Sequence, residues 1–207
     1  MMRRLALRLV LGGVGVYLVI CTVMFTVQRY LVFHPSTRDV ALAVQQVRGA
    51  RVELLETRDG ETLKSWWVPP ATDDAAVYLY LHGNAATLAS RAARLGFLTE
   101  QGAGVLAVSW RGYGGSTGSP TEAGLRLDAD AAYEWLAARV AARRVIVFGE
   151  SLGTALAVDV AAEHETAALV LDSAFTSVTD AARAQYPWLP VDWLLLDRFD
   201  SLALAPR

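Results

Sequence analysis

A five-residue pattern in the last third of the chain constrains its fold more than any other feature. Residues 149–153 read Gly-Glu-Ser-Leu-Gly; the apolar run 145–148 precedes them, and the small, apolar stretch 154–158 follows. A G-x-S-x-G between a strand pattern and a helix pattern is typical of a sharp turn above the carboxyl edge of a parallel sheet. The turn presents a serine hydroxyl to solvent, so we predict that Ser151 is a nucleophile.

The residues around this serine match what such a turn requires. Gly149 and Gly153 are small at the two places where backbones crowd. Leu152 would begin the helix, so its backbone amide is placed to donate a hydrogen bond to a developing oxyanion. A plain glycine-lined turn between a strand and a helix is the alternative, and the flanking patterns favour the catalytic interpretation over it.

A second turn follows another predicted strand. The apolar stretch 76–81 runs directly into residues 82–85, which read His-Gly-Asn-Ala. A loop after a parallel strand can supply the second oxyanion amide, and Gly83 would let the backbone approach a substrate closely. The amide of Asn84 is the predicted donor, with that of Ala85 as the alternative. By itself the stretch is equally compatible with an ordinary glycine turn.

A glycine-rich stretch, residues 110–122, follows the predicted strand 104–109. It ends in a helix-start signal in which Ser119 is the predicted cap, Pro120 the first-turn residue and Glu122 the residue three positions on. The predicted helix has an apolar face at a spacing of three to four residues: Leu125, Ala129, Ala132, Leu136 and Val140.

Together these motifs resemble the α/β-hydrolase superfamily, in particular its membrane-anchored serine-hydrolase branch, related to protein depalmitoylases and dipeptidyl-peptidase-like hydrolases. The resemblance extends over residues 29–204 and is carried by the order and spacing of residues 82–84, 111–120 and 149–153. It implies an α/β fold, a mostly parallel sheet with helices on both faces, over residues 45–207. It also implies cleavage of an ester, thioester or amide through an acyl-enzyme.

The histidine and aspartate that such a family uses beside its serine are harder to place. His164 would lie at the far end of the helix that Ser151 precedes, about 20 Å away and out of reach of a general base. His82 is predicted to be a buried imidazole that holds its loop. Asp172 ends the next strand, a position that some hydrolases use for the acid, but support of the local loop is the favoured interpretation. The resemblance places the acid and base after Arg207, so we expect an incomplete hydrolase domain, its N-terminal two thirds, with little activity alone.

The N-terminus carries a separate signal. Residues 9–28 are 20 positions without a charge, enough to span about 30 Å as a helix. Three arginines precede this stretch: Arg3, Arg4 and Arg8. We predict a cytoplasmic tip and transmembrane anchor over residues 1–35, with the hydrolase domain outside the cytoplasm. Arg29 on the other flank weakens the charge asymmetry. A cleaved signal peptide is disfavoured because no A-x-A-like site follows the apolar run.

Between anchor and core, residues 40–47 predict a brief amphipathic helix. Residues 52–57 and 63–68 alternate in polarity around Asp-Gly at 59–60 and predict an antiparallel hairpin. At the other end of the chain, the strand 168–171 is expected to be an exposed parallel edge.

The apolar segment 186–196 contains two tryptophans, Trp188 and Trp193. Two interpretations are open: the segment lines an acyl or peptide pocket near the serine, or it packs under further strands. The sequence does not favour either one.

Composition excludes several other classes of protein. Gly112 and Gly114 are followed by Thr117 where a dinucleotide fingerprint needs its third glycine, and no phosphate-binding loop motif is present. No basic patch accompanies the net charge of −2, so no nucleic-acid partner is expected. With three scattered histidines and the single cysteine Cys21, we expect neither a metal site nor a cofactor.

Two hypotheses follow. The first is a membrane-anchored serine hydrolase that acts on a small-molecule or acylated substrate through Ser151. The second is a non-catalytic, membrane-tethered module of the same fold that binds acyl groups or a protein. The substrate and the oligomeric state are not indicated by the sequence.

Overall fold

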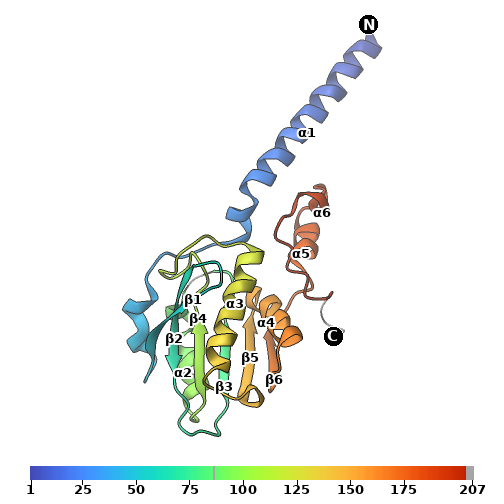
Figure 1. Ribbon diagram of the computed structural model, residues 1–207. Helices are drawn as coiled ribbons and strands as arrows, with labels where there is room; N and C mark the ends of the chain where they lie inside the picture. The colour runs from blue at the N-terminus through green and yellow to red at the C-terminus, as the bar shows by residue number, and fades with distance from the viewer. Residues whose placement is uncertain (86, 204–207) are drawn as a thin grey trace.

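A single twisted sheet positions everything that follows (Figure 1). The computed structural model describes residues 1–85 and 87–203, so Leu204 and the last positions of the predicted domain 45–207 lie outside the described residues. The strands are β1 (Arg51–Glu56), β2 (Thr62–Val68), β3 (Val77–Leu81), β4 (Gly104–Val108), β5 (Val145–Glu150) and β6 (Ala168–Asp172). The helices of the domain are η1 (Val40–Gln46), η2 (Leu88–Arg91), α2 (Ala92–Thr99), α3 (Glu122–Ala137), η3 (Ala142–Arg144) and α4 (Leu152–Glu163).

The order of the strands is β1-β2-β4-β3-β5-β6, and the four strands from β4 to β6 are parallel. β1 and β2 form the predicted antiparallel hairpin, with Gly60 at a φ of 87° in its turn. Within the described residues β6 is an edge strand, and the side chains of Leu169, Val170 and Leu171 on it are exposed, as predicted. This arrangement confirms the predicted α/β-hydrolase fold.

Helices cover both faces of the sheet because the strand residues alternate between two apolar clusters. On one face, Leu79 and Leu106 pack with residues of α3 and α4. On the other face, Tyr80 and Ala107 pack with residues of η1, η2 and α2. A parallel sheet buried on both faces in this way reads as nearly continuous apolar strands, which is why the sequence identified them.

The helix start was predicted two residues too early. The N-cap of α3 is Thr121, whose side chain accepts a hydrogen bond from the amide of Gly124 at 3.0 Å; Ser119 lies outside the helix. Thr121 has extended backbone angles, and its oxygen is three residues from the amide it caps, which is the geometry of a cap. The predicted apolar face is buried, although Val140 lies beyond the end of α3.

Register brings the ends of three parallel strands to one edge of the sheet. Leu81 of β3 is opposite Gly149 of β5, and Glu150 is opposite Asp172 of β6. The turns that follow these strands therefore meet at the carboxyl edge, where open α/β sheets bind their ligands.

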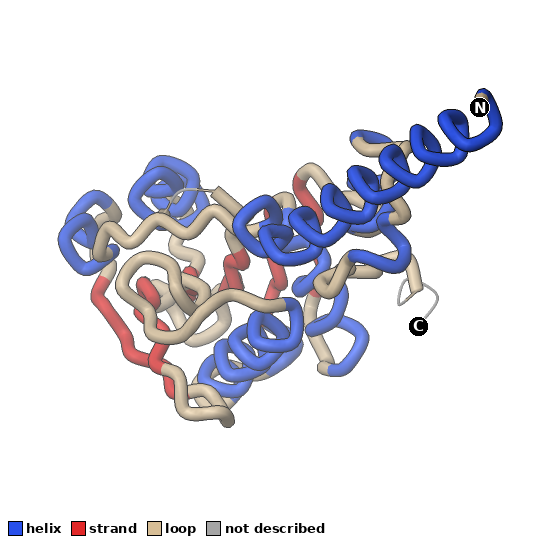
Figure 2. The backbone as a smooth tube through the Cα atoms, turned by 90° about the horizontal axis from the view of Figure 1, so that it is seen from above, coloured by secondary structure: helices blue, strands red, loops and turns tan. Residues whose placement is uncertain are grey.

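Two further parts lie beyond this edge. Helix α1 (Met2–Val32) is long and apolar enough to cross a membrane, and it projects away from the domain (Figure 1). A segment that we call the cap (residues 173–203) contains α5 (Val178–Gln185) and α6 (Val191–Leu194). Seen from above, the cap lies beside the domain-proximal part of α1 (Figure 2).

Candidate active site

Ser151 occupies a strained turn between β5 and α4. Its φ of 50° and ψ of −117° lie in a region that residues with a side chain rarely adopt. The backbone amide of Ser151 donates to the carbonyl of Asp172 at 2.9 Å, which ties the turn to the end of β6. The residue is exposed, so the strained turn presents a hydroxyl at the carboxyl edge of the sheet, as the motif predicts.

Three glycines make this turn sterically feasible. A Cβ on Gly153 would lie 2.0 Å from the carbonyl oxygen of Leu81, and one on Gly149 would lie 2.6 Å from the carbonyl oxygen of Gly153. A Cβ on Gly83 would approach the Cβ of Ser151 to 3.1 Å. Gly149 and Gly153 thus lie where only a hydrogen fits, and at Gly83 the loop that follows β3 lies against the serine.

The side chain of Asn84 fixes that loop to the end of α1. Its Oδ1 accepts hydrogen bonds from the amide of His34 at 3.0 Å and from the hydroxyl of Tyr113 at 2.8 Å, and its Nδ2 donates to the carbonyl of Val32. The side-chain amide of Asn84 is thus engaged, and the predicted oxyanion donor is its backbone amide. Leu152, the first residue of α4, has an amide without an acceptor inside the helix.

His82 is buried and holds the backbone of its loop. Its Nδ1 lies 2.6 Å from the carbonyl oxygen of Gly83, and the backbone carbonyl of His82 accepts a hydrogen bond from Trp110 Nε1 at 2.9 Å. Burial lowers the pKa of His82 to about 4, so the ring is neutral at physiological pH. These contacts agree with the predicted supporting role for this histidine.

A network of charges beneath the elbow was not foreseen from the sequence. Glu150, the variable residue of the motif, accepts hydrogen bonds from Arg91 at 2.6 and 3.0 Å and one from the hydroxyl of Tyr80. Arg94 lies 3.5 Å from the same carboxylate and donates to Asp172 at 2.5 Å. Burial alone would raise the pKa of Glu150, but these bonds and charges lower it overall. The elbow therefore rests on an ionised carboxylate held by two arginines.

Asp172, considered above as an acid, has its carboxylate occupied. Besides Arg94, it accepts a hydrogen bond from the hydroxyl of Ser173 at 3.0 Å, and these two bonds lower its pKa. Among the described residues no histidine contacts it. Its observed role is to support the turn, through its side chain and through the carbonyl that receives the Ser151 amide.

Ser151 opens into an apolar cavity of about 370 Å³. Helix α1 contributes one wall: Met24, Gln28, Leu31 and Val32. The cap contributes the opposite wall, including Val178, Ala181, Leu189, Val191, Leu194 and Leu195. Asn84 and Leu152, the two predicted oxyanion donors, line the floor together with the serine. The candidate nucleophile, the two residues whose amides are the candidate donors, and a set of apolar side chains thus share one space.

For the apolar segment 186–196, this cavity supports the interpretation that the segment lines a pocket near the serine. Tyr186 and Leu189 line the space around Ser151, although they lie more than thirty positions later in the sequence. Trp188 and Trp193 do not line it; their side chains are turned outward and exposed. The aliphatic residues between the tryptophans thus face the cavity, whereas the tryptophans face outward.

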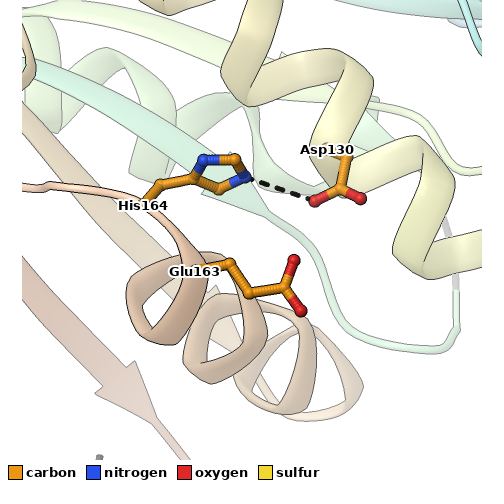
Figure 3. A group of neighbouring side chains, drawn as sticks. All are labelled: Asp130, Glu163 and His164. Carbon is orange, nitrogen blue, oxygen red and sulfur yellow. Dashed lines mark hydrogen bonds and ion pairs between the residues drawn. The ribbon is translucent and has the colours of Figure 1, made fainter.

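His164 lies at the opposite end of α4, as its C-cap (Figure 3). Its Nε2 is 3.4 Å from Asp130 of α3, and its ring stacks on Tyr133. Glu163 completes a group of three residues whose ligand atoms lie within 4.8 Å of one another. The three histidines are scattered in the sequence, but the packing of α3 on α4 brings His164 and Glu163 next to Asp130. The group pins the end of the helix, and it lies about 18 Å along α4 from the serine.

A buried arginine holds the glycine-rich stretch in place. Arg111 donates to both carboxylate oxygens of Asp128 on α3, at 2.8 Å each, and to Asp59 in the β1–β2 turn at 2.7 and 3.0 Å. Gly124 allows this, because a Cβ there would lie 2.7 Å from the guanidinium. The stretch thus links the hairpin, β4 and α3.

Comparison with known proteins gives a consistent picture. The family model described as "alpha/beta hydrolase fold" matches residues 78–206. An uncharacterized protein of Mycobacterium tuberculosis is 40% identical over 186 residues, which is 88% of this chain and 66% of that protein. Lysophosphatidylserine lipase ABHD12 of Mus musculus is 34% identical over 66% of this chain and 37% of the lipase. An esterase of Pyrococcus furiosus superposes with a TM-score of 0.55 at 26% identity, over 70% of this chain and 57% of the esterase. The chain therefore spans less than two thirds of the length of these relatives.

Proposed function

The chain belongs to the α/β-hydrolase family, and from this premise we propose that it is a membrane-anchored serine hydrolase that cleaves an acyl ester, thioester or amide. The observation that carries the proposal is the strained Ser151 turn, which opens into an apolar cavity of about 370 Å³ beside two candidate oxyanion donors. An apolar cavity of this size suits an acyl chain rather than a charged group. A lipase and an esterase among the similar proteins support the same class of reaction.

In the proposed reaction, the Ser151 hydroxyl attacks the acyl carbonyl carbon. The amides of Leu152 and Asn84 stabilise the negative charge that develops on the carbonyl oxygen, as preorganised donors do in this family of sites. The bond to the leaving group then breaks, the leaving group takes up the proton of the serine, and a water molecule hydrolyses the acyl-enzyme. Each turnover consumes one water and releases one acid and one alcohol, thiol or amine.

Proton transfer from Ser151 needs a general base. Within the described part of the chain, the serine hydroxyl has no hydrogen bond to a histidine: His82 is buried against its own loop and His164 lies at the far end of α4. We propose that the base comes from sequence beyond Arg207, in keeping with the greater length of the relatives. The 207-residue chain alone should then be a poor catalyst.

The lack of a base among the described residues also favours the second candidate, a non-catalytic module of the same fold. The two candidates differ in whether Ser151 ever becomes reactive. Three proteins in detergent distinguish them: the 207-residue chain, a product extended through the downstream reading frame, and the extended product with Ser151→Ala. The hydrolase predicts labelling by a fluorophosphonate for the extended product only. If none of the three is labelled, the non-catalytic candidate gains.

For the anchor, we propose that α1 crosses a membrane once with its N-terminus in the cytoplasm. The arginines at positions 3, 4 and 8 support this orientation, and the domain would then lie on the extracytoplasmic side. A protease added to right-side-out cells should cleave the domain if the orientation is as proposed. Cleavage only after the cells are permeabilised would contradict it.

A further inference from the structure

The cap is bound to α1 along a considerable length of the helix. The contacts are a hydrogen bond from the Tyr17 hydroxyl to the carbonyl of Trp188 at 2.9 Å, two bonds through the Gln28 amide, and an ion pair between Arg29 and Asp197 at 3.0 Å. Tyr17 and Gln28 are eleven positions apart on the helix, which is about 16 Å along the axis. The cap therefore runs beside the apolar part of α1 as well as its end (Figures 1 and 2).

These contacts satisfy backbone groups of the cap that are not paired in regular structure. Gln28 is nearly fully buried; its Nε2 donates to the carbonyl of Leu194 at 3.0 Å, and its Oε1 accepts from the amide of Leu196 at 2.8 Å. Irregular backbone is tolerated at membrane depth only where the protein satisfies its polar groups. Tyr17 and Gln28 supply such partners from within the uncharged stretch of α1.

The outer surface of the cap has the opposite character. Trp193 is 89% exposed and Trp188 54%, and Leu196 and Tyr186 are also exposed. Exposed aromatic residues of this kind are enriched where a protein meets the interface between lipid and water. The patch is continuous with α1, because Trp188 is itself bonded to Tyr17.

The charges of the cap indicate how deep it can lie. Arg183 pairs with Asp180 at 2.7 Å and with Asp192 at 2.5 Å, and Arg198 donates to the carbonyl of Asp192 at 2.8 Å. Partly exposed, paired charges are suited to the headgroup region and are costly in the hydrocarbon centre. The bond to Tyr17 takes Trp188 deeper, about 16 Å along α1 from the level of Gln28.

From these four observations, and resting on the proposed anchor and hydrolase function, we infer that the cap is a second membrane contact. It lies in the leaflet that α1 enters, with Trp188 and Trp193 among the lipids. Because α1 and the cap are the two walls of the Ser151 cavity, the substrate is an acyl lipid that moves from this leaflet between the two walls to the serine. Met24 on α1 and Leu194 on the cap face this path.

The depth of the cap can be measured without catalysis. Cys21 is the only cysteine, so a Cys21→Ser background accepts a nitroxide label at one chosen site. Three sites are compared in phosphatidylcholine vesicles: Trp193→Cys on the cap, Leu18→Cys on α1, and Phe97→Cys, an exposed aromatic position on α2. We expect the labels at 193 and 18 to relax more with oxygen than with a water-soluble nickel complex, and the label at 97 to show the reverse. A label at 193 that behaves like the one at 97 overturns the inference. If the label at 18 does so as well, the anchor itself has failed.

Entry of lipid is tested on the extended product with two fluorophosphonates, one with a long alkyl chain held in vesicles and one short and soluble. Trp188→Ser with Trp193→Ser should slow labelling by the long-chain probe about tenfold and leave the short probe unaffected, while Phe97→Ser changes neither. Equal effects on both probes contradict lateral entry. Labelling by neither probe in the unaltered protein contradicts the hydrolase function, while the nitroxide data still report whether the cap contacts lipid.

Discussion

At the scale of single residues, Ser151 combines an unfavourable backbone conformation with an exposed position at the cavity. Its φ of 50° and ψ of −117° cost about 1–3 kcal/mol for a residue with a Cβ. The surroundings hold this conformation through the hydrogen bond to Asp172, the packed glycines and the arginine-bound Glu150. Strain kept in this way at one residue is a mark of function rather than of stability.

Relief of this strain should stabilise the protein. Ser151→Gly removes the Cβ and with it both the strain and the hydroxyl. We therefore expect the free energy of unfolding to rise by about 1 kcal/mol, and fluorophosphonate labelling of the extended product to vanish. Ser151→Ala keeps the Cβ and should lose labelling with no such gain. Urea denaturation of both variants in detergent measures the difference, and equal stabilities would show that the turn is not strained.

His82 predicts a dependence of stability on pH. Its pKa is about 4 in the folded protein, because of burial, against about 6.5 when unfolded. Above pH 6.5 both states are neutral and the full stability is present. As the pH falls from 6.5 toward 4, only the unfolded state takes up the proton, and up to about 3 kcal/mol is lost.

The His82→Gln variant should therefore have a flatter profile of unfolding free energy between pH 6.5 and 4 than the unaltered protein, whatever its stability at neutral pH. Denaturant titrations at a series of pH values measure both slopes. Parallel profiles would mean that the imidazole is protonated in the folded state across this range.

At the scale of elements, the junction of β5 and α4 depends on how closely the helix approaches the sheet. Gly153 is in the first turn of α4, and its backbone touches the carbonyl of Leu81 on β3. The charge network acts at the same junction from below, since Arg91 and Arg94 come from η2 and α2 and hold the end of β5. The elements on both faces of the sheet thus set the position of the serine.

Adding one methyl group should change the free energy of unfolding in opposite directions at two helical glycines. Gly153→Ala places a Cβ 2.0 Å from a carbonyl oxygen, so α4 must move and we expect a loss of about 3 kcal/mol or more. Gly96→Ala on α2 meets nothing within 4 Å and should gain about 0.5–1 kcal/mol, as alanine does in helices. Unfolding curves for the pair test this contrast, and similar values would mean that α4 does not pack as described.

At the scale of the whole molecule, the site is assembled from both ends of the chain. Gln28 near the N-terminus and Leu194 near the C-terminus are bonded to each other and line the same cavity above the serine. Helix α1, the cap and the Ser151 turn therefore form one structural unit, in which the proposed anchor is also a wall of the pocket.

Breaking this link should loosen the cap. Gln28→Leu leaves the carbonyl of Leu194 and the amide of Leu196 without their partner, so we expect faster hydrogen exchange across residues 189–197 and about 1–3 kcal/mol less protection there. Thr26→Val is the matched control, because among the described residues the Thr26 hydroxyl bonds only to its own helix, at the carbonyl of Val23. Unchanged exchange in Gln28→Leu would show that α1 and the cap are independent.

Much of this molecule could be predicted from its sequence, and the division has a physical basis. The strands, the elbow, the Asn84 loop and the apolar N-terminal helix are local patterns of spacing and polarity. The N-cap residue of α3 was misplaced because Ser119 and Thr121 both suit an N-cap position, and only the packed helix selects between them. The Glu150 network and the α1 wall of the cavity involve residues far apart in the chain, and no local pattern encodes such pairs.

The most direct test of the central claim is to map the modified residue after the extended product reacts with a fluorophosphonate. Proteolysis and mass spectrometry of the labelled protein identify the peptide and the side chain that carry the phosphonyl group. A single adduct on Ser151, absent from Ser151→Ala, is the predicted result. An adduct on another hydroxyl, or an unmodified Ser151 in folded protein, would contradict its role as the nucleophile.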